Sequence, residues 1–219
     1  MITIKLEPLL KRPEISVSSI KNWADWKKEL ISDFTVFLHS ANYRFSLGSG
    51  SSYLVKQIID AEKAMHGKSA LEKEIQKIKK TPVCGVQITN GGNLPGLFQC
   101  QRDDSIKQYP NFNKIVHCII PGPRITDFEV KVKEMLSEAF SRTADAYKEQ
   151  DKELFFVLPV IGFNNFGYPV DFILPLYARL IKEWIKEEQM KGHILIWLNE
   201  ALSEKMRLMM GEINVKAQL

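Results

Sequence analysis

The 219-residue sequence contains little cysteine, and its three cysteines do not form a recognisable disulfide or metal motif. Cys84, Cys100 and Cys118 show no CxxC spacing, and an odd number leaves at least one of them unpaired. This pattern excludes a disulfide-rich secreted scaffold and a cysteine-based metal centre. We therefore expect a reduced, cytoplasmic protein without a metal site.

Long hydrophobic runs are also missing. No apolar run approaches the ~18 residues that a membrane-spanning helix needs. The first 14 residues lack a long apolar segment followed by small residues, so we expect no signal peptide. The sequence predicts a monomer that works in water, with no membrane span.

Neither sign of charge dominates the chain, which has 30 Lys and Arg against 26 Asp and Glu, a formal net charge of +4. Lys and Glu are interspersed in residues 72–80 and 182–191. Such mixtures are typical of solvated helix faces rather than of nucleic-acid-binding surfaces, so we expect no specific nucleic-acid partner. The slight positive balance suits an anionic ligand.

Apolar runs alternate with amphipathic segments along most of the chain. The expected strands are residues 15–20, 34–38, 83–89, 114–120, 154–161 and 193–198, and the expected helices are residues 23–31, 53–65, 71–80, 128–147, 170–188 and 202–210. This order predicts one α/β domain over residues 1–219, a three-layer sandwich with a mixed sheet of about six strands and helices on both faces. Residues 1–14 are expected to be an N-terminal extension and residues 97–113 a polar loop insertion.

Two glycine-containing loops each follow a strand-like run and precede a helical pattern. The first is residues 42–52 (NYRFSLGSGSS), with Ser51 or Ser52 as the expected helix cap, and the second is residues 159–169 (PVIGFNNFGYP). In parallel α/β sheets, loops at the carboxyl ends of strands form the ligand crevice, and helix N-termini bind anions. The two loops therefore predict a phosphate-binding crevice with a diphosphate as its natural guest.

The order of these motifs resembles that of the macrodomain family, a family of ADP-ribose-binding α/β modules. Residues 38–42 (LHSAN) and 47–52 (LGSGSS) are similar to its Val-Asn-Ala-Ala-Asn strand end and Gly-rich loop. Residues 89–95 (TNGGNLP), followed by a strand with Ile-Val-His, resemble its Thr-x-Gly-x-x-Leu-Pro turn and Val-Ile-His strand. Residues 159–169 resemble its Pro-Ala-Ile-Ser-Thr-Gly-x-Tyr/Phe-Gly-Tyr-Pro signature. The resemblance extends over nearly the whole chain.

The resemblance implies that ADP-ribose is the ligand or product and that no cofactor is needed. Asn42 would bind the distal ribose and place the attacking water, Ser52 would occupy a catalytic position, and Phe166 would pack against the ribose. The implied ligand-binding residues are Gly48, Ser49, Gly50 and Ser51 in the first loop, Gly162, Phe163, Asn164, Asn165 and Gly167 in the second, and Ser19, Ile20, Leu198 and Asn199 around the adenine.

Four of these positions differ from the family pattern. Ser19 replaces an acid near the adenine, Ser49 replaces a glycine of the phosphate loop, and Asn164 stands where the second loop has glycine. Ser52 stands where some hydrolysing members carry an acid. A serine needs a partner to act as a general base, and the nearby sequence offers no His or Asp for this role.

The leading hypothesis is a hydrolase that removes ADP-ribose from protein side chains, with an ADP-ribosylated protein as its partner. The serine substitutions favour an alternative, a non-catalytic reader of ADP-ribose. A third hypothesis is an adaptor that has lost the pocket and uses residues 97–113 to meet a partner. His39 and His117 are expected to be hydrogen-bonded core residues. The location would be cytoplasmic, or the host cytosol if the protein is a secreted bacterial effector.

Overall fold

The computed structural model describes residues 2–4, 14–18, 34–42, 44–47, 51–80, 85–94, 97–102, 105–110, 112–122, 124–148, 150, 152–162, 166–187, 192–198 and 200–216. The strands of the main sheet are β1 (Ile2–Ile4), β2 (Glu14–Ser18), β3 (Phe34–Ala41), β4 (Gly85–Asn90), β7 (Lys114–Ile119), β8 (Leu154–Pro159) and β9 (Gly192–Trp197). The helices are α1 (Ser51–His66), α2 (Ala70–Lys80), α3 (Phe128–Tyr147), α4 (Val170–Glu187) and α5 (Glu200–Lys216).

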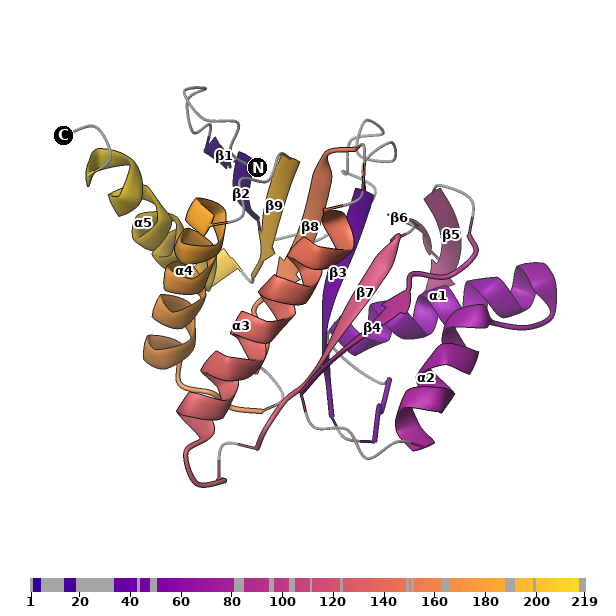
Figure 1. Ribbon diagram of the computed structural model, residues 1–219. Coiled ribbons are helices and arrows are strands. Elements are labelled where there is room, and N and C mark those ends of the chain that lie inside the picture. The colour runs from indigo at the N-terminus through magenta and orange to yellow at the C-terminus, as the bar shows by residue number, and fades with distance from the viewer. Residues whose placement is uncertain are drawn as a thin grey trace.

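Within these residues, seven strands form one mixed sheet in the order β1-β2-β9-β8-β3-β7-β4. The neighbours from β2 to β7 are parallel, whereas β1 and β4 run antiparallel at the two edges. The predicted α/β sandwich is confirmed, with β1 as an additional strand inside the segment expected to be an extension. Because five neighbouring strands run in one direction, their carboxyl ends lie along one edge of the sheet, at the bottom of Figure 1.

Helices cover both faces of the sheet, with α1 and α2 on one face and α3, α4 and α5 on the other (Figure 1). Side chains of β3 alternate between the two sides, as the strand repeat requires. Val36 and Leu38 belong to the core under α3 and α4, whereas Phe37 and Ala41 belong to the core under α1. Every second residue of this strand therefore faces the helix that follows the first loop.

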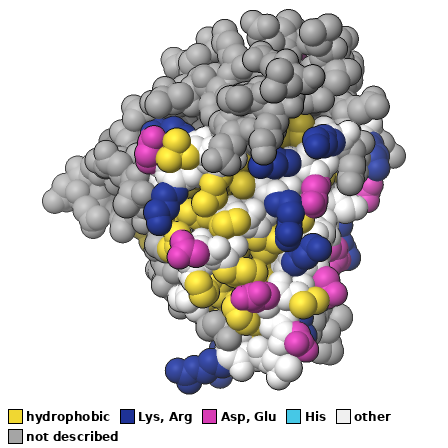
Figure 2. Space-filling model, turned by 90° about the vertical axis from the view of Figure 1, so that its left-hand side faces the viewer, with side chains coloured by type: hydrophobic (Ala, Val, Ile, Leu, Met, Phe, Trp, Pro, Cys, Tyr) yellow, Lys and Arg dark blue, Asp and Glu magenta, His cyan; other side chains and the backbone are white. Residues whose placement is uncertain are grey.

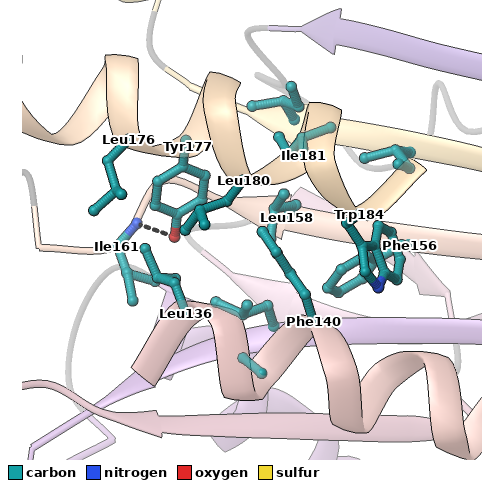
Figure 3. Packing of buried hydrophobic residues seen from close by; sticks show 14 of the residues in the cluster. Leu136, Phe140, Phe156, Leu158, Ile161, Leu176, Tyr177, Leu180, Ile181 and Trp184 are labelled. Atoms are coloured by element: carbon teal, nitrogen blue, oxygen red, sulfur yellow. Dashed lines mark hydrogen bonds between the residues drawn. The ribbon is translucent and has the colours of Figure 1, made fainter. Parts of the chain in front are cut away.

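The core under α3 and α4 is built around aromatic contacts. Trp184 of α4 is only 5% exposed, and its ring lies 5.4 Å from that of Phe140 and 5.5 Å from that of Phe156. Figure 3 shows the three side chains together between the two helices. Burying a large apolar side chain in such a core stabilises the fold by about 1.5–3 kcal/mol.

The expected polar loop at residues 97–113 is wrong. Strands β5 (Leu97–Arg102) and β6 (Ser105–Pro110) form a separate antiparallel hairpin, in which Arg102 pairs with Ser105. A ladder of backbone hydrogen bonds does not require an apolar face, so the polar composition concealed the two strands.

Charged side chains of both signs cover the outer surface of the helices. Figure 2 shows Lys and Arg interspersed with Asp and Glu around hydrophobic side chains on one face. On α4, Arg179, Glu183 and Lys186 are exposed, as expected for a solvated helix face. Among the described residues, no helix combines the length and apolar character needed to cross a membrane.

Candidate functional site

The two predicted loops begin at neighbouring strand ends. Strands β3 and β8 are adjacent and parallel, with Phe37 opposite Val157, and they end at Ala41 and Pro159. Strands β7 and β9 flank this pair, and their ends lie beside the same two residues. The chain segments that leave β3 and β8 therefore enter one region at the carboxyl edge of the sheet, where parallel α/β folds bind ligands.

Part of the candidate site can be described in atomic detail. The described candidates are Asn42, Ser51, Ser52, Gly162, Phe166, Gly167 and Leu198. The other candidates, namely Ser19, Ile20, Gly48, Ser49, Gly50, Phe163, Asn164, Asn165 and Asn199, lie outside the described residues.

Asn42 organises the turn that follows β3. Its side-chain Oδ1 accepts hydrogen bonds from the backbone N–H groups of Arg44, at 2.9 Å, and Ser46, at 3.1 Å. Its backbone carbonyl accepts a third from Phe45, at 2.9 Å, a residue with a left-handed φ of 49°. Asn42 therefore fixes the chain direction after the strand through its oxygen atoms, and its amide Nδ2 takes no part in these bonds.

The start of α1 is attached to the end of β3 through three serines. Ser40 donates its backbone N–H to Ser51 Oγ, at 3.2 Å, and the two hydroxyl oxygens are 2.8 Å apart. Ser52 donates its hydroxyl to the Ser40 carbonyl oxygen, at 3.0 Å. The expected capping role is therefore wrong, since both side chains bond to the neighbouring strand and hold the first turn of α1 against it.

A row of four buried polar side chains runs from α1 into the sheet, and we call Ser52, His39, His117 and Thr89 the histidine row. Ser52 Oγ lies 2.9 Å from His39 Nε2, His39 Nδ1 lies 2.8 Å from His117 Nδ1, and His117 Nε2 lies 2.8 Å from Thr89 Oγ1. The two histidines are hydrogen-bonded core residues, as expected. Contrary to expectation, however, a histidine partner for Ser52 does exist, only 13 positions earlier in the sequence.

Both imidazoles of the histidine row have no exposed surface. Burial lowers the pKa of His39 well below its ordinary value, and the neighbouring His117 lowers it further. Burial alone lowers the pKa of His117 to about 3. The two rings are therefore neutral at pH 7, and each carries a single N–H.

The second loop is anchored at its start by Tyr177 of α4. The Tyr177 hydroxyl donates to the Pro159 carbonyl oxygen, at 3.1 Å, and accepts from the Ile161 N–H, at 3.0 Å. Figure 3 shows the contact with Ile161 deep in the core. One buried side chain thus satisfies two backbone groups where the chain leaves β8.

The same loop is closed on itself by Tyr168. The backbone N–H of Tyr168 donates to the Gly162 carbonyl oxygen, at 2.9 Å, and its hydroxyl donates to the Pro121 carbonyl oxygen. Gly162 has a φ of +82°, and a Cβ at this position would lie 2.1 Å from the Tyr168 ring. The conformation and the close ring both require glycine here.

Scans against protein-family models and against curated proteins found no match to this chain. Solved structures do match. The Oceanobacillus iheyensis macrodomain with ADP has a TM-score of 0.65 at 15% identity, and the match covers 99% of this chain and 100% of that one. A variant of that macrodomain with ADPR has a TM-score of 0.65 at 15% identity, over 97% and 98% of the two chains. The Trypanosoma brucei macrodomain in complex with ADP has a TM-score of 0.51 at 13% identity, over 91% and 69%.

The chain has the macrodomain fold. The likeness extends over nearly its full length despite the low identity, so it is a divergent example of this fold. The candidate site has two sides within this fold. One is the end of β3 with the start of α1, and the other is the end of β8 with the loop that Tyr168 closes.

Two further candidates of this macrodomain fold are placed by the described residues. The Phe166 ring is partly buried against the core and lies 6.4 Å from the Tyr168 ring. Leu198 follows β9 and is 6% exposed, so its side chain contributes to the core beside the strand ends. In the described part of the chain, no group of three or more His, Cys, Asp or Glu is placed to hold a metal ion.

Proposed function

We propose that this protein binds ADP-ribose attached to protein side chains and hydrolyses the bond between the ribose and the side chain. One observation carries the proposal: the two motif-bearing loops start at neighbouring carboxyl ends of the parallel strands β3 and β8. The first of them leads into α1, a 16-residue helix whose N-terminus is suited to a diphosphate. The macrodomain fold supports the same ligand class.

Hydrolysis at the ribose passes through a transition state that resembles an oxocarbenium ion. In the proposed reaction, water forms a bond to the anomeric carbon as the bond to the protein side chain breaks, and a water proton leaves with the side chain. Asn42 would place this water and Phe166 would pack against the ribose. Holding the reactants in place can lower the barrier by about 7 kcal/mol in well-aligned cases, so positioning can supply much of the catalysis.

A second function, reading ADP-ribose without cleaving it, is favoured by the contacts of Ser52. Its hydroxyl already donates to the Ser40 carbonyl oxygen, and its oxygen also contacts His39. A proton taken by Ser52 would have to move onto a buried imidazole, which burial keeps neutral. Ser52 is therefore a poor general base, and a protein limited to binding would need no base.

Titration calorimetry of the full chain with ADP-ribose tests the binding step. Heat that fits one site supports both ligand-based functions, whereas no heat from folded protein excludes both. Gly50→Glu provides the matched variant, because a carboxylate in the predicted phosphate loop would repel the diphosphate. Unchanged affinity of this variant would reject the loop assignment.

Release of label from a mono-ADP-ribosylated protein then separates hydrolase from reader. Asn42→Asp keeps an oxygen for the Arg44 and Ser46 amides but removes the Nδ2 donor, so we expect an intact fold and at least ~10-fold slower release. The control is Asn113→Asp. The Asn113 Oδ1 accepts from Thr35 beside the start of β7, at the opposite edge of the sheet. If the substrate keeps all of its label after incubation with the wild-type protein, hydrolysis of this substrate is excluded and the reader function remains.

A further inference from the structure

The histidine row crosses three adjacent strands on the face that α1 covers. His39 of β3 lies directly opposite His117 of β7, and Thr89 comes from β4, which pairs with the other side of β7. Ser52 completes the row from the second residue of α1. The row therefore joins the candidate site at the carboxyl edge to the interior of the sheet.

The contacts of the row fix where its hydrogen atoms lie. Ser52 has one hydroxyl hydrogen and donates it to the Ser40 carbonyl oxygen, so its oxygen accepts from His39 Nε2–H. A neutral imidazole has one N–H, so His39 Nδ1 must accept from His117 Nδ1–H. The remaining nitrogen, His117 Nε2, then accepts from the Thr89 hydroxyl. In this arrangement every hydrogen of the row has an acceptor.

The same arrangement makes the row unsuited to proton transfer. If Ser52 passed a proton to His39, an imidazolium ion would form among fully buried groups. If Ser52 gave its proton away and took another from His39, the row would be one proton short. The resulting negative charge would lie on His39 or, after further transfers along the row, on Thr89. Neither the positive nor the negative charge has an oppositely charged partner among the contacts of the row. The role that remains for the row is therefore to hold Ser52 in place.

We infer that His39 and His117 are positioning residues of the first loop. They hold Ser52 as a hydrogen-bond acceptor and thereby keep the first turn of α1 against the end of β3. The Ser40 contacts to Ser51 and Ser52 transmit this constraint to the helix start. The role rests on the proposed ADP-ribose-binding function, because it concerns the turn that would meet the diphosphate.

The first test needs no ligand. Long-range ¹H–¹⁵N spectra of the full chain, with ¹⁵N-labelled histidine, report which ring nitrogen carries the hydrogen. At pH 7 we expect His39 to carry it on Nε2 and His117 to carry it on Nδ1. Nδ1–H at His39, or a charged ring at either position, overturns the inference. A merely space-filling pair would show no fixed tautomers, and this outcome also overturns it.

The second test measures ADP-ribose affinity by calorimetry. His39→Leu removes the donor to Ser52, and we expect about 10-fold weaker binding, whereas His39→Gln keeps a side-chain N–H and should restore most of it. The control is Thr35→Val on the same face of β3, four residues away at the other end of the strand. Thr35 is also buried and hydrogen-bonded, so its loss destabilises the fold without affecting the loop.

The outcomes separate this inference from the proposed function. Equal affinity losses in His39→Leu, His39→Gln and Thr35→Val overturn the positioning role, because they follow from general destabilisation. If His39→Leu does not fold, Ser52→Ala replaces it, since it removes the acceptor that fixes the hydrogen on His39 Nε2 and should release both tautomers. If the wild type does not bind ADP-ribose, the proposed function fails. The role is then decided by the tautomers and by the Ser51 and Ser52 amide shifts, which His39→Leu must change and Thr35→Val must not.

Discussion

The ring of Tyr168 lies so close to Gly162 that no side chain can be added to the glycine without moving the ring. A Cβ at Gly162 would lie 2.1 Å from the ring, whose hydroxyl is held by the Pro121 carbonyl oxygen. The backbone bond between the two residues closes the second loop at the same point. This contact constrains the side of the candidate site that follows β8.

Gly162→Ala is expected to lower the free energy of unfolding by about 2–4 kcal/mol, because left-handed strain adds to the overlap with the ring. Gly167→Ala is the matched control. Gly167 also has a left-handed φ, of +67°, but no atom within 4 Å of an added Cβ, so we expect a loss of only about 1–2 kcal/mol. Urea denaturation measures both, and equal losses would contradict the overlap argument.

Tyr177→Phe should destabilise the protein by about 1–3 kcal/mol, because the buried Ile161 N–H loses its acceptor. Tyr168→Phe removes a hydroxyl that donates to the carbonyl oxygen of the partly exposed residue Pro121, so its cost should be smaller. Thermal melting of both variants checks this order. A Tyr177→Phe protein as stable as wild type would show that the bridge contributes nothing.

Acidification should destabilise the protein through the buried histidines. The native pKa of His117 is about 3, below the ordinary value near 6.5, so protons bind the unfolded chain first. The contribution of neutral, buried His117 to the free energy of unfolding is therefore complete above pH 6.5. It is lost as the pH falls toward 3, by about 1.4 kcal/mol per pH unit. His39 acts in the same direction.

Urea denaturation at pH 7, 6 and 5 measures this slope. His117→Phe should be less stable at pH 7 but should lose less stability on acidification than the wild type. The carboxylates are common to both proteins, so the difference between the slopes isolates the histidine. Parallel slopes would show that His117 binds protons equally well in the native and the unfolded protein.

Cys118 is expected to be unreactive in the folded protein. It has no exposed surface, and burial raises the pKa of its thiol, with a further rise from the Glu138 carboxylate. Because the thiolate is the reacting form, alkylation should be at least ~100-fold slower than in the unfolded chain. Mass spectrometry of the Cys118 peptide after iodoacetamide treatment, with and without urea, tests this directly, and equal rates would contradict the burial.

The helices could be predicted well from the sequence because their patterns are local. The apolar spacing from Phe128 to Tyr147 predicts the observed bounds of α3, and the apolar side chains at positions 132, 135, 136, 139 and 140 are buried. The hairpin of β5 and β6 could not be found in this way, because its strands do not alternate apolar and polar residues regularly and their pairing depends on backbone bonds. Local periodicity thus predicts packing, but it does not report strand pairing where the alternation is irregular.

The candidate site was predictable as an order of motifs, but its internal contacts were not. His39 and His117 are 78 positions apart, and only the register of β3 against β7 brings them together. The contact between His39 and Ser52 had a weak signal, because His39 shares a strand face with Phe37 and Ala41 and so points toward the following helix. The central phosphate-loop residues, Gly48 to Gly50, remain predictions.

The hydrogen bond from the Tyr168 N–H to the Gly162 carbonyl oxygen joins the two ends of residues 162–168 directly. Changes between these two residues need not be transmitted to β8 or α4, because each end is anchored separately. Ligand preference could therefore diverge here by substitution while thermal stability is retained. Under the proposed function, a library confined to positions 163–165, which leaves the core-packed Phe166 unchanged, would be the starting point for changing the preferred nucleotide.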